Sequence, residues 1–372
     1  MINLDYASHT PVCETVLAHM CQVAREYQGN VMAAHSAGRK ARAEMDRITS
    51  GIGAVIGAKA SEIIFVSGAS EANNLAIKGI ANAYSHVGKH ILSTCLEHPS
   101  VSGTLNTLIP QGYEVELLKI LPSGHIDLQH LKAAIRPSTV LVCVSGVDSE
   151  LGAIQPLEAI GEIVAQHPHC HLHVDAAQAV GKIPSAFVGS TFAFSPHKFH
   201  GPCGIGVLVK REGVVLEPLI HGGASTTIYR SGTPTLMLTA GAHMALDVAV
   251  KALPQRLSVV RQLNEAILAG VANIPHMWVN SPLVDGSPYI LNLGIRNMRG
   301  IQVQEALDRL GIWVSVKSAC STDNAPSRPV MAVTGDKKRA LSSFRVSLSH
   351  ETTPQDVAQL LAALSAIAQQ HQ

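Results

Sequence analysis

Two residues at the ends of predicted strands have the chemistry to hold and polarise an aromatic cofactor. Asp175 lies near the end of the run HCHLHVDAAQ, and Lys198 is the last residue of the run TFAFSPHK. A carboxylate can keep a pyridinium nitrogen protonated, so that the ring becomes an electron sink for a substrate carbanion. A lysine at a neighbouring strand end can hold the aldehyde of that cofactor as an imine. Alone, each residue is more often a helix cap or a surface lysine; together, and followed by Gly204 and Gly206, they predict a pyridoxal 5′-phosphate site.

Residues 67–71, SGASE, follow a predicted strand and open a helix. Backbone N–H groups and a hydroxyl at a helix N-terminus can bind phosphate, although the same pattern also serves as an ordinary helix cap. Ser195 and His197, beside Lys198, could contact the ring edge and the phosphate. His98 follows the strand KHILSTCLE and could stack on the ring and transfer protons near neutral pH, or it could be a structural histidine.

Two residues nearer the C-terminus suit the substrate side of such a site. Cys320 lies in VKSACSTDNAPSRP, a polar segment of small residues that is typical of a mobile loop, and a thiolate there could act as a nucleophile. Arg345 is a lone charge within SSFRVSLS, where it either grips a substrate carboxylate or points outward from an edge strand. The alternating histidines of residues 167–173 could share one strand face, but no carboxylate accompanies them, so no metal site is expected.

The composition favours a small-molecule enzyme over a nucleic-acid or membrane protein. The chain has 372 residues, is 47% hydrophobic and carries a formal net charge of +1. It shows no run of like charge and no apolar stretch of the roughly 18–20 residues that a membrane span needs. The start, MINLDYASHTPV, has no signal-peptide pattern, and the cysteines form no CxxC pair. We therefore expect a cytoplasmic protein that binds no metal, nucleic acid or membrane.

Strand and helix patterns alternate along most of the chain. Apolar runs predict strands over 62–68, 89–98, 113–120, 139–146, 169–178, 191–198 and 204–211. Such alternation predicts an α/β fold with a doubly wound, mostly parallel sheet, in which ligands bind at the carboxyl ends of the strands. A long helical pattern over 240–275 then leads to further strands near 289–295, 313–320 and 343–349. We predict a large cofactor-binding domain over 15–250 and a small α/β domain, made of 1–14 plus 251–372, that carries the Cys320 loop.

Ordered motifs across nearly the whole chain resemble a known family. The motifs are LDYASHTPV, SGASEANNLAIKG, LEHPSV, HVDAAQAVGKIP, FSPHKFHGPCGIG, HGG followed by YRSGTP, SAC and FRVSLS. In this order they resemble the cysteine desulfurases, which are fold-type I pyridoxal-phosphate enzymes of the class V aminotransferase branch. The SAC motif with a long following loop is similar to the mobile-loop subgroup of that family.

The resemblance implies a role for each matching position. Lys198 would form the Schiff base, Asp175 would pair with the pyridine nitrogen, and His98 would stack on the ring and relay protons. Cys320 would take the substrate sulfur as a persulfide and release alanine. The remaining implied contacts are Gln178 with the ring hydroxyl, Ala69, Ser70, Ser195 and His197 with the phosphate, Thr233 of a partner subunit with the same phosphate, and Arg345 and Asn30 with the substrate carboxylate. The Thr233 contact implies a homodimer.

Some positions depart from the family pattern. Ser149, in VDSELG, stands where the family usually has an asparagine that touches the ring oxygen and the substrate carboxylate. A hydroxyl is shorter than an amide and offers one donor, so both contacts change. Residues 224–226, the Asn30-Val31 pair and Pro196 also differ from the usual residues. These departures indicate a divergent paralogue.

The sequence leaves three functions to distinguish. The leading hypothesis is a cysteine desulfurase that converts L-cysteine to L-alanine and passes sulfur from Cys320 to an acceptor protein. The alternative is a related C–S or C–Se lyase, of the selenocysteine lyase or cystine lyase type, which would not need Cys320. A protein that keeps the fold for partner binding alone is disfavoured by the combination of Lys198, Asp175, His98 and Cys320.

Overall fold

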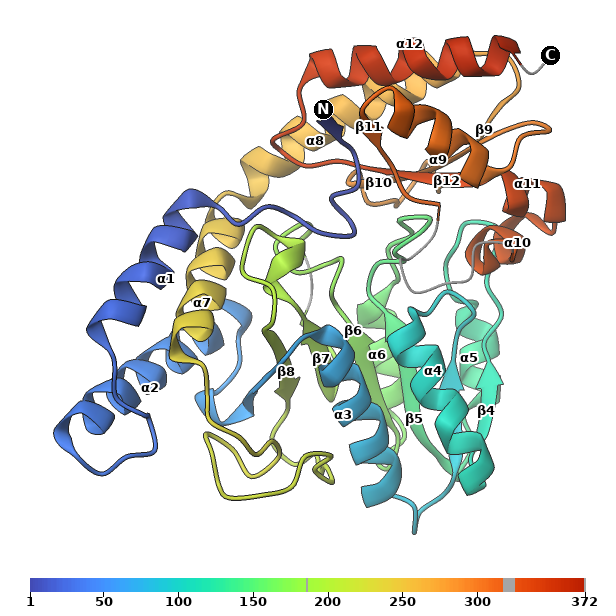
Figure 1. Ribbon diagram of the computed structural model, residues 1–372. Coiled ribbons are helices and arrows are strands. Elements are labelled where there is room, and N and C mark those ends of the chain that lie inside the picture. The colour runs from blue at the N-terminus through green and yellow to red at the C-terminus, as the bar shows by residue number, and fades with distance from the viewer. Residues whose placement is uncertain (185–186, 317–324, 371–372) are drawn as a thin grey trace.

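A seven-stranded sheet forms the centre of the larger part of the molecule (Figure 1). The computed structural model describes residues 1–184, 187–316 and 325–370. The strand order is β2-β8-β7-β6-β5-β3-β4, and β8 runs antiparallel to both neighbours while the other pairs are parallel. The strands are β2 (Ile63–Val66), β3 (His90–Ser93), β4 (Glu114–Leu117), β5 (Thr139–Ser145), β6 (His171–Asp175), β7 (Thr191–Phe194) and β8 (Gly206–Lys210). The predicted doubly wound, mostly parallel α/β fold is confirmed.

Helices cover both faces of this sheet, which explains why a central strand such as β5 is mostly apolar. Strand β5 is buried at every position. Helices α3 (Ala69–Ala83) and α4 (Pro99–Leu108) pack on one face in an apolar cluster that includes Leu75, Ile77 and Ile80. The apolar cluster on the other face includes residues of α1 (Glu14–Glu26), α2 (Ser36–Ile56), α5 (Leu128–Ala134), α6 (Leu157–Ala165) and α7 (Leu236–Lys251).

A smaller unit lies above the carboxyl ends of the large sheet in Figure 1. Its strands are β9 (Met277–Val279), β10 (Ile290–Ile295) and β12 (Ser343–Ser347), in the order β12-β10-β9, and the parallel pair β1 (Ile2–Asn3) and β11 (Ile312–Trp313). Its helices are α8 (Leu253–Val271), α9 (Gly300–Arg309), α10 (Arg328–Thr334), α11 (Lys337–Ser342) and α12 (Pro354–Gln370).

The three larger apolar clusters follow the two sheets, while a small fourth cluster of Leu96, Leu151, Val330 and Ala340 joins the two parts. The cluster around the smaller sheet draws its buried residues from positions 2–7 and 257–368, whereas those flanking the large sheet draw on 16–249. The division into 15–250 and 1–14 plus 251–372 stays a prediction, and these clusters support it.

Two predicted elements differ from those observed. The helical pattern over 240–275 forms two helices, α7 and α8, with a bend of 68° between them. Pro254 in the first turn of α8 explains the break, because proline is tolerated there but not in a helix interior. The strand predicted near 313–320 is limited to β11 within the described residues, and Ser315 adds only an isolated bridge to Arg345.

A search of the described helices for one long and apolar enough to cross a membrane finds none, and only the bent pair α7 and α8 meets those criteria when taken together.

Candidate active site

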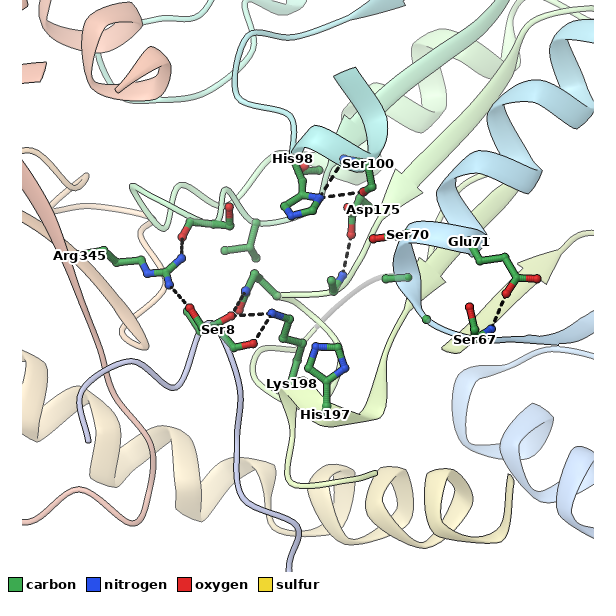
Figure 2. A pocket seen from close by; sticks show the side chains of 18 residues that line it. Ser8, Ser67, Ser70, Glu71, His98, Ser100, Asp175, His197, Lys198 and Arg345 are labelled. Carbon is green, nitrogen blue, oxygen red and sulfur yellow. Dashed lines mark hydrogen bonds between the residues drawn. The ribbon is translucent and has the colours of Figure 1, made fainter. Parts of the chain in front are cut away.

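One pocket gathers most of the residues that the sequence singled out. It has a volume of about 360 Å³, within the range of small-molecule sites of roughly 300–1,000 Å³. Figure 2 shows Ser67, Ser70 and Glu71 at one end, Arg345 at the other, and His98, Asp175 and Lys198 between them. The predicted site residues that line the pocket are Ala69, Ser70, His98, Ser149, Asp175, Gln178, His197, Lys198 and Arg345.

Asp175, the last residue of β6, is held by two donors and is only 6% exposed. Its Oδ1 accepts from the backbone N–H of Ala177 at 3.0 Å, and its Oδ2 accepts from Asn73 Nδ2 at 2.8 Å. Asn73 Oδ1 lies 3.0 Å from Nε2 of His173, whose pKa is lowered by burial to about 4. His173 is therefore neutral at pH 7, and its Nε2–H donates to Asn73, which fixes the amide with its NH₂ toward Asp175.

His98 caps helix α4 and presents its other ring nitrogen to the pocket. Its Nδ1 accepts from the backbone N–H of Ser100 at 3.1 Å and also lies 2.8 Å from the Ser100 hydroxyl. Because a backbone N–H can only donate, Nδ1 carries no proton, and Nε2 carries it instead. Burial lowers the pKa of His98, and the positive charges of Lys198 and Arg345 add to this against the opposing effect of Asp175. The site thus contains a neutral imidazole with an Nε2–H donor.

Lys198 ends a short 3₁₀ turn (Pro196–Lys198) that follows β7. Its Nζ donates to the carbonyl oxygens of Ala7 at 2.8 Å and Ser8 at 2.7 Å (Figure 2). Residues 5–10 thus cross the pocket from the smaller sheet to the lysine. Thr10 continues this contact, since both its N–H and its hydroxyl donate to the His197 carbonyl.

The end of the pocket near α3 has the features of a phosphate site. The first residues of a helix leave N–H groups without an intrahelical acceptor, and Ala69 and Ser70 are those residues here. Gly68 lies in the turn between β2 and α3, and strand β8 comes so close to this turn that a Cβ on Gly206 would lie 2.4 Å from the Gly68 backbone. Only glycine at 206 therefore allows the strand to support the turn.

Ser195 does not line the pocket and is fully buried behind it. Its hydroxyl donates to the Ile205 carbonyl at 2.9 Å and lies 2.9 Å from His197 Nδ1. Because the Ser195 hydroxyl proton is donated to Ile205, the Ser195 oxygen acts as acceptor toward His197, and His197 Nδ1–H donates to it. Burial, with Lys198, His9 and Lys182 nearby, lowers the pKa of His197 to about 4. Ser195 therefore orients His197, and its contact with the phosphate stays a prediction.

Arg345 lies in the middle of β12 and is 2% exposed, so the outward-facing alternative is wrong. Its Nη1 donates to the Ser149 carbonyl at 2.8 Å, and its Nη2 donates to Asp5 at 2.8 Å and to the Ser8 hydroxyl at 2.7 Å. Its Nε is buried and has no hydrogen-bond partner among the described residues. The residue itself lines the pocket, and a guanidinium there is suited to a carboxylate.

Two further predicted residues lie outside this pocket, and a third is not among the described residues. Asn30 is exposed and does not line the pocket; its Oδ1 accepts from Met32 N at 2.9 Å. Thr233 lines a separate pocket with Ser67 and Arg230. Cys320 lies outside the described residues. The roles of all three stay predictions.

Asn73 and Ser100 are the pocket-supporting residues that the sequence analysis missed. Asn73 is 0% exposed within a helix whose neighbouring buried positions are apolar, such as Leu75 and Ala76. A polar residue on the apolar stripe of a helix was the available signal, because such a residue needs a buried partner. Ser100 carried no comparable signal.

Comparisons with known proteins agree on the family. Residues 2–360 match the family described as aminotransferase class-V. Cysteine desulfurase IscS of Neisseria meningitidis serogroup C (strain 053442) is 37% identical over 363 residues, which cover 96% of this chain and 89% of that protein. A solved structure named NifS-like protein superposes with a TM-score of 0.92 at 31% identity, covering 99% of both chains.

A second solved structure, described as SspA in complex with cysteine, superposes with a TM-score of 0.81 at 31% identity, covering 95% of this chain and 100% of that one. The resemblance inferred from the motifs is thereby confirmed. The chain belongs to the aminotransferase class-V family and, within it, to the cysteine desulfurases.

Proposed function

We propose that the protein is a pyridoxal-phosphate-dependent cysteine desulfurase with its cofactor on Lys198. The observation that carries this proposal is the convergence of Asp175, His98, Lys198 and Arg345 on one pocket. The residues present fit the cofactor: the start of α3 suits its phosphate, and Asp175, oriented by Asn73, suits its ring nitrogen. When bound, pyridoxal 5′-phosphate would delocalise the electron pair left at the substrate Cα.

The chain's own residues then have separate tasks. Arg345, which lines the pocket, binds the substrate carboxylate and so orients the amino acid. Lys198, between Ala7 and Ser8, takes the Cα proton and later returns a proton. His98 offers an Nε2–H donor above the same space.

The sulfur goes to Cys320 in our proposal. The Cys320 thiolate attacks the substrate sulfur, the substrate C–S bond breaks with its electron pair left on carbon, and that carbon is then protonated. The products are alanine and a persulfide on Cys320, which passes sulfur to an acceptor protein or to a thiol reductant. No further oxidant or reductant is required for the first half of the reaction.

We further propose that the active form is a homodimer in which Thr233 serves the partner's site. Exposed apolar side chains are frequent on the segment that carries Thr233. Those between positions 215 and 237 are Val215, Leu219, Ile220, Ile228 and Met237, and Ile228 is 76% exposed. Apolar side chains gathered in this way are typical of a surface that is covered by another chain.

The alternative function, a C–S or C–Se lyase, rests on Ser149. This residue lines the pocket and offers its backbone carbonyl to Arg345, where the family usually has an asparagine amide. A shorter side chain at this position would hold the substrate less firmly, which would favour elimination to pyruvate and ammonia over desulfuration.

The test is to incubate the protein with pyridoxal 5′-phosphate, L-cysteine and a thiol reductant and to quantify alanine, pyruvate and sulfide together. We expect alanine and sulfide in equal amounts. The Cys320→Ala variant should retain the cofactor and lose alanine formation, whereas Cys203→Ala, at an exposed cysteine, is the matched control. Pyruvate in place of alanine, or full activity of Cys320→Ala, would contradict the proposed desulfuration.

A further inference from the structure

Lys182 is a buried lysine that the proposed mechanism does not use. It is 5% exposed and lies behind the main pocket, which it does not line. Burial lowers the pKa of Lys182 well below its ordinary value, and the positive charges of Lys198 and Arg345 add to this. On its other side lie Arg256 and Tyr289, whose ring centroid is 6.0 Å from Lys182 Nζ. Burying an amine among cations is costly, so a compensating role is expected.

The hydrogen bonds of Lys182 lead to the pocket through one residue. Lys182 Nζ donates to Gln178 Oε1 at 2.7 Å, and Gln178 Nε2 donates to the Ala7 carbonyl at 2.8 Å. A backbone carbonyl can only accept, so the amide must turn its NH₂ to Ala7 and its oxygen to Lys182. Gln178 itself lines the pocket, and the second N–H of its amide is left for that space.

We propose that Lys182 is a positioning residue that keeps Gln178 as a hydrogen-bond donor toward the bound cofactor. By occupying Oε1, Lys182 removes the only acceptor of this side chain from the pocket. Gln178 then stabilises a negatively charged oxygen on the cofactor ring and disfavours its protonation. This inference rests on the proposed function, because it needs a pyridine cofactor with an ionisable ring oxygen in the pocket.

Without Lys182, the carbonyl oxygen of Gln178 would be buried with no partner. The amide would then rotate or shift to satisfy that oxygen, and its donor would no longer be fixed in the pocket. Lys182→Met removes the hydrogen-bond donor and keeps an unbranched side chain of similar length. Lys182→Gln keeps an N–H donor but cannot carry a positive charge. The two variants therefore separate hydrogen bonding from charge.

The experiment titrates the visible absorption of the bound cofactor with pH and measures pyridoxal 5′-phosphate affinity by equilibrium dialysis. In Lys182→Met we expect the pKa of the chromophore to rise by about one unit and the affinity to fall roughly tenfold. Lys182→Gln should stay close to wild type in both. In a Gln178→Ala background, Lys182→Met should add little, because both changes remove the same donor. Melting temperatures confirm that each variant is folded.

Several outcomes would overturn the proposal. An unchanged chromophore pKa in folded Lys182→Met excludes the positioning role. A Lys182→Gln variant as altered as Lys182→Met would mean that charge, and not hydrogen bonding, is responsible. Additive effects with Gln178→Ala would show that Lys182 does not act through Gln178. A wild-type protein that binds no pyridoxal 5′-phosphate would instead refute the proposed function, so the two failures are distinguishable.

Discussion

The Asp175 end of the pocket and its Arg345 end differ in where their supporting contacts come from. Asp175 is held through Asn73 and His173, and all three belong to β6 and to a helix that packs on the same sheet. Arg345 is held by Asp5 and Ser8, which are far from it in sequence, and by a loop after β5. One end is therefore formed within a packed layer, whereas the other is assembled from separate segments.

This difference suggests that the Asp175 end binds the cofactor and the Arg345 end binds the substrate. A cofactor that stays bound through many turnovers needs a rigid site, and buried, fully paired networks provide rigidity. A substrate must enter and leave, and contacts between separate segments can open without disturbing the sheet. We therefore expect mutations at the two ends to change different measured quantities.

Lys198→Ala should have the largest effect, because Lys198 lies between the two ends and serves both. We expect the visible cofactor absorption to disappear and alanine formation to fall by at least roughly a thousandfold. Lys132→Ala, at an exposed lysine, is the control and should behave as wild type. A Lys198→Ala variant with substantial activity would place the chemistry on another residue.

Arg345→Ala should chiefly raise the KM for L-cysteine, by roughly 10- to 100-fold, because a charge-assisted contact to the substrate carboxylate is lost. The absorption spectrum of the bound cofactor should remain unchanged. Steady-state kinetics and spectra on the same preparation check both statements. If the spectrum were lost and KM were unaltered, the two ends would not be independent.

Asn73→Ala should weaken cofactor binding and leave the KM for L-cysteine nearly unchanged, the opposite of Arg345→Ala. Removing its amide takes a donor from Asp175 and leaves Nε2 of His173 without its acceptor, so we expect pyridoxal 5′-phosphate affinity to fall roughly 5- to 30-fold. The KM at saturating cofactor should change little. Asn74→Ala, on the same helix with its amide on the Ser70 carbonyl, is the matched control. Equal affinity of the two variants would argue against the Asn73 contact.

Glu97→Gln should have the smallest effect and concerns stability. Burial raises the pKa of Glu97 to about 7 from the ordinary value of 4.5, and Thr94 and Ser145 donate to this carboxyl group. The folded protein therefore keeps a proton that the unfolded chain has lost, and its stability falls as pH rises from about 4.5 to about 7.

A neutral amide avoids that loss, so the Tm difference between Glu97→Gln and wild type should become more positive by roughly 2–4 °C between pH 5 and pH 8. Thermal melts at both values check this, with Glu305→Gln at an exposed position as control. A difference that does not depend on pH would mean that Glu97 is not protonated in the folded protein.

The fold was predictable from sequence for those strands that are buried on both faces of the sheet. Strands such as β5 are covered on both faces, so they appear as continuous apolar runs. The split between α7 and α8 was less visible, because the apolar pattern continues through Pro254. The length of strand β11 was overestimated, because the sequence does not show that only two residues of an apolar run pair with another strand.

The site was predictable to the extent that strand ends determine it. Asp175 and Lys198 follow neighbouring strands, and the carboxyl ends of parallel strands lie on one edge of the sheet. Asn73 was signalled by its place on an apolar helix stripe, but its partner Asp175 lies far away in sequence. Ser100 contacts His98 and Lys182 contacts Gln178 nearby in sequence, yet the residue types alone do not show that these side chains meet. The burial of Lys182 in particular follows from packing of the turn after β6, which the sequence does not reveal.

The attachment point of the cofactor is the most direct test of the account. The protein would be loaded with pyridoxal 5′-phosphate, reduced with borohydride, digested and mapped by mass spectrometry. We expect a single cofactor adduct, on the peptide that contains Lys198, with Lys182 unmodified. An adduct on Lys182, or a protein that carries no adduct after loading, would contradict it.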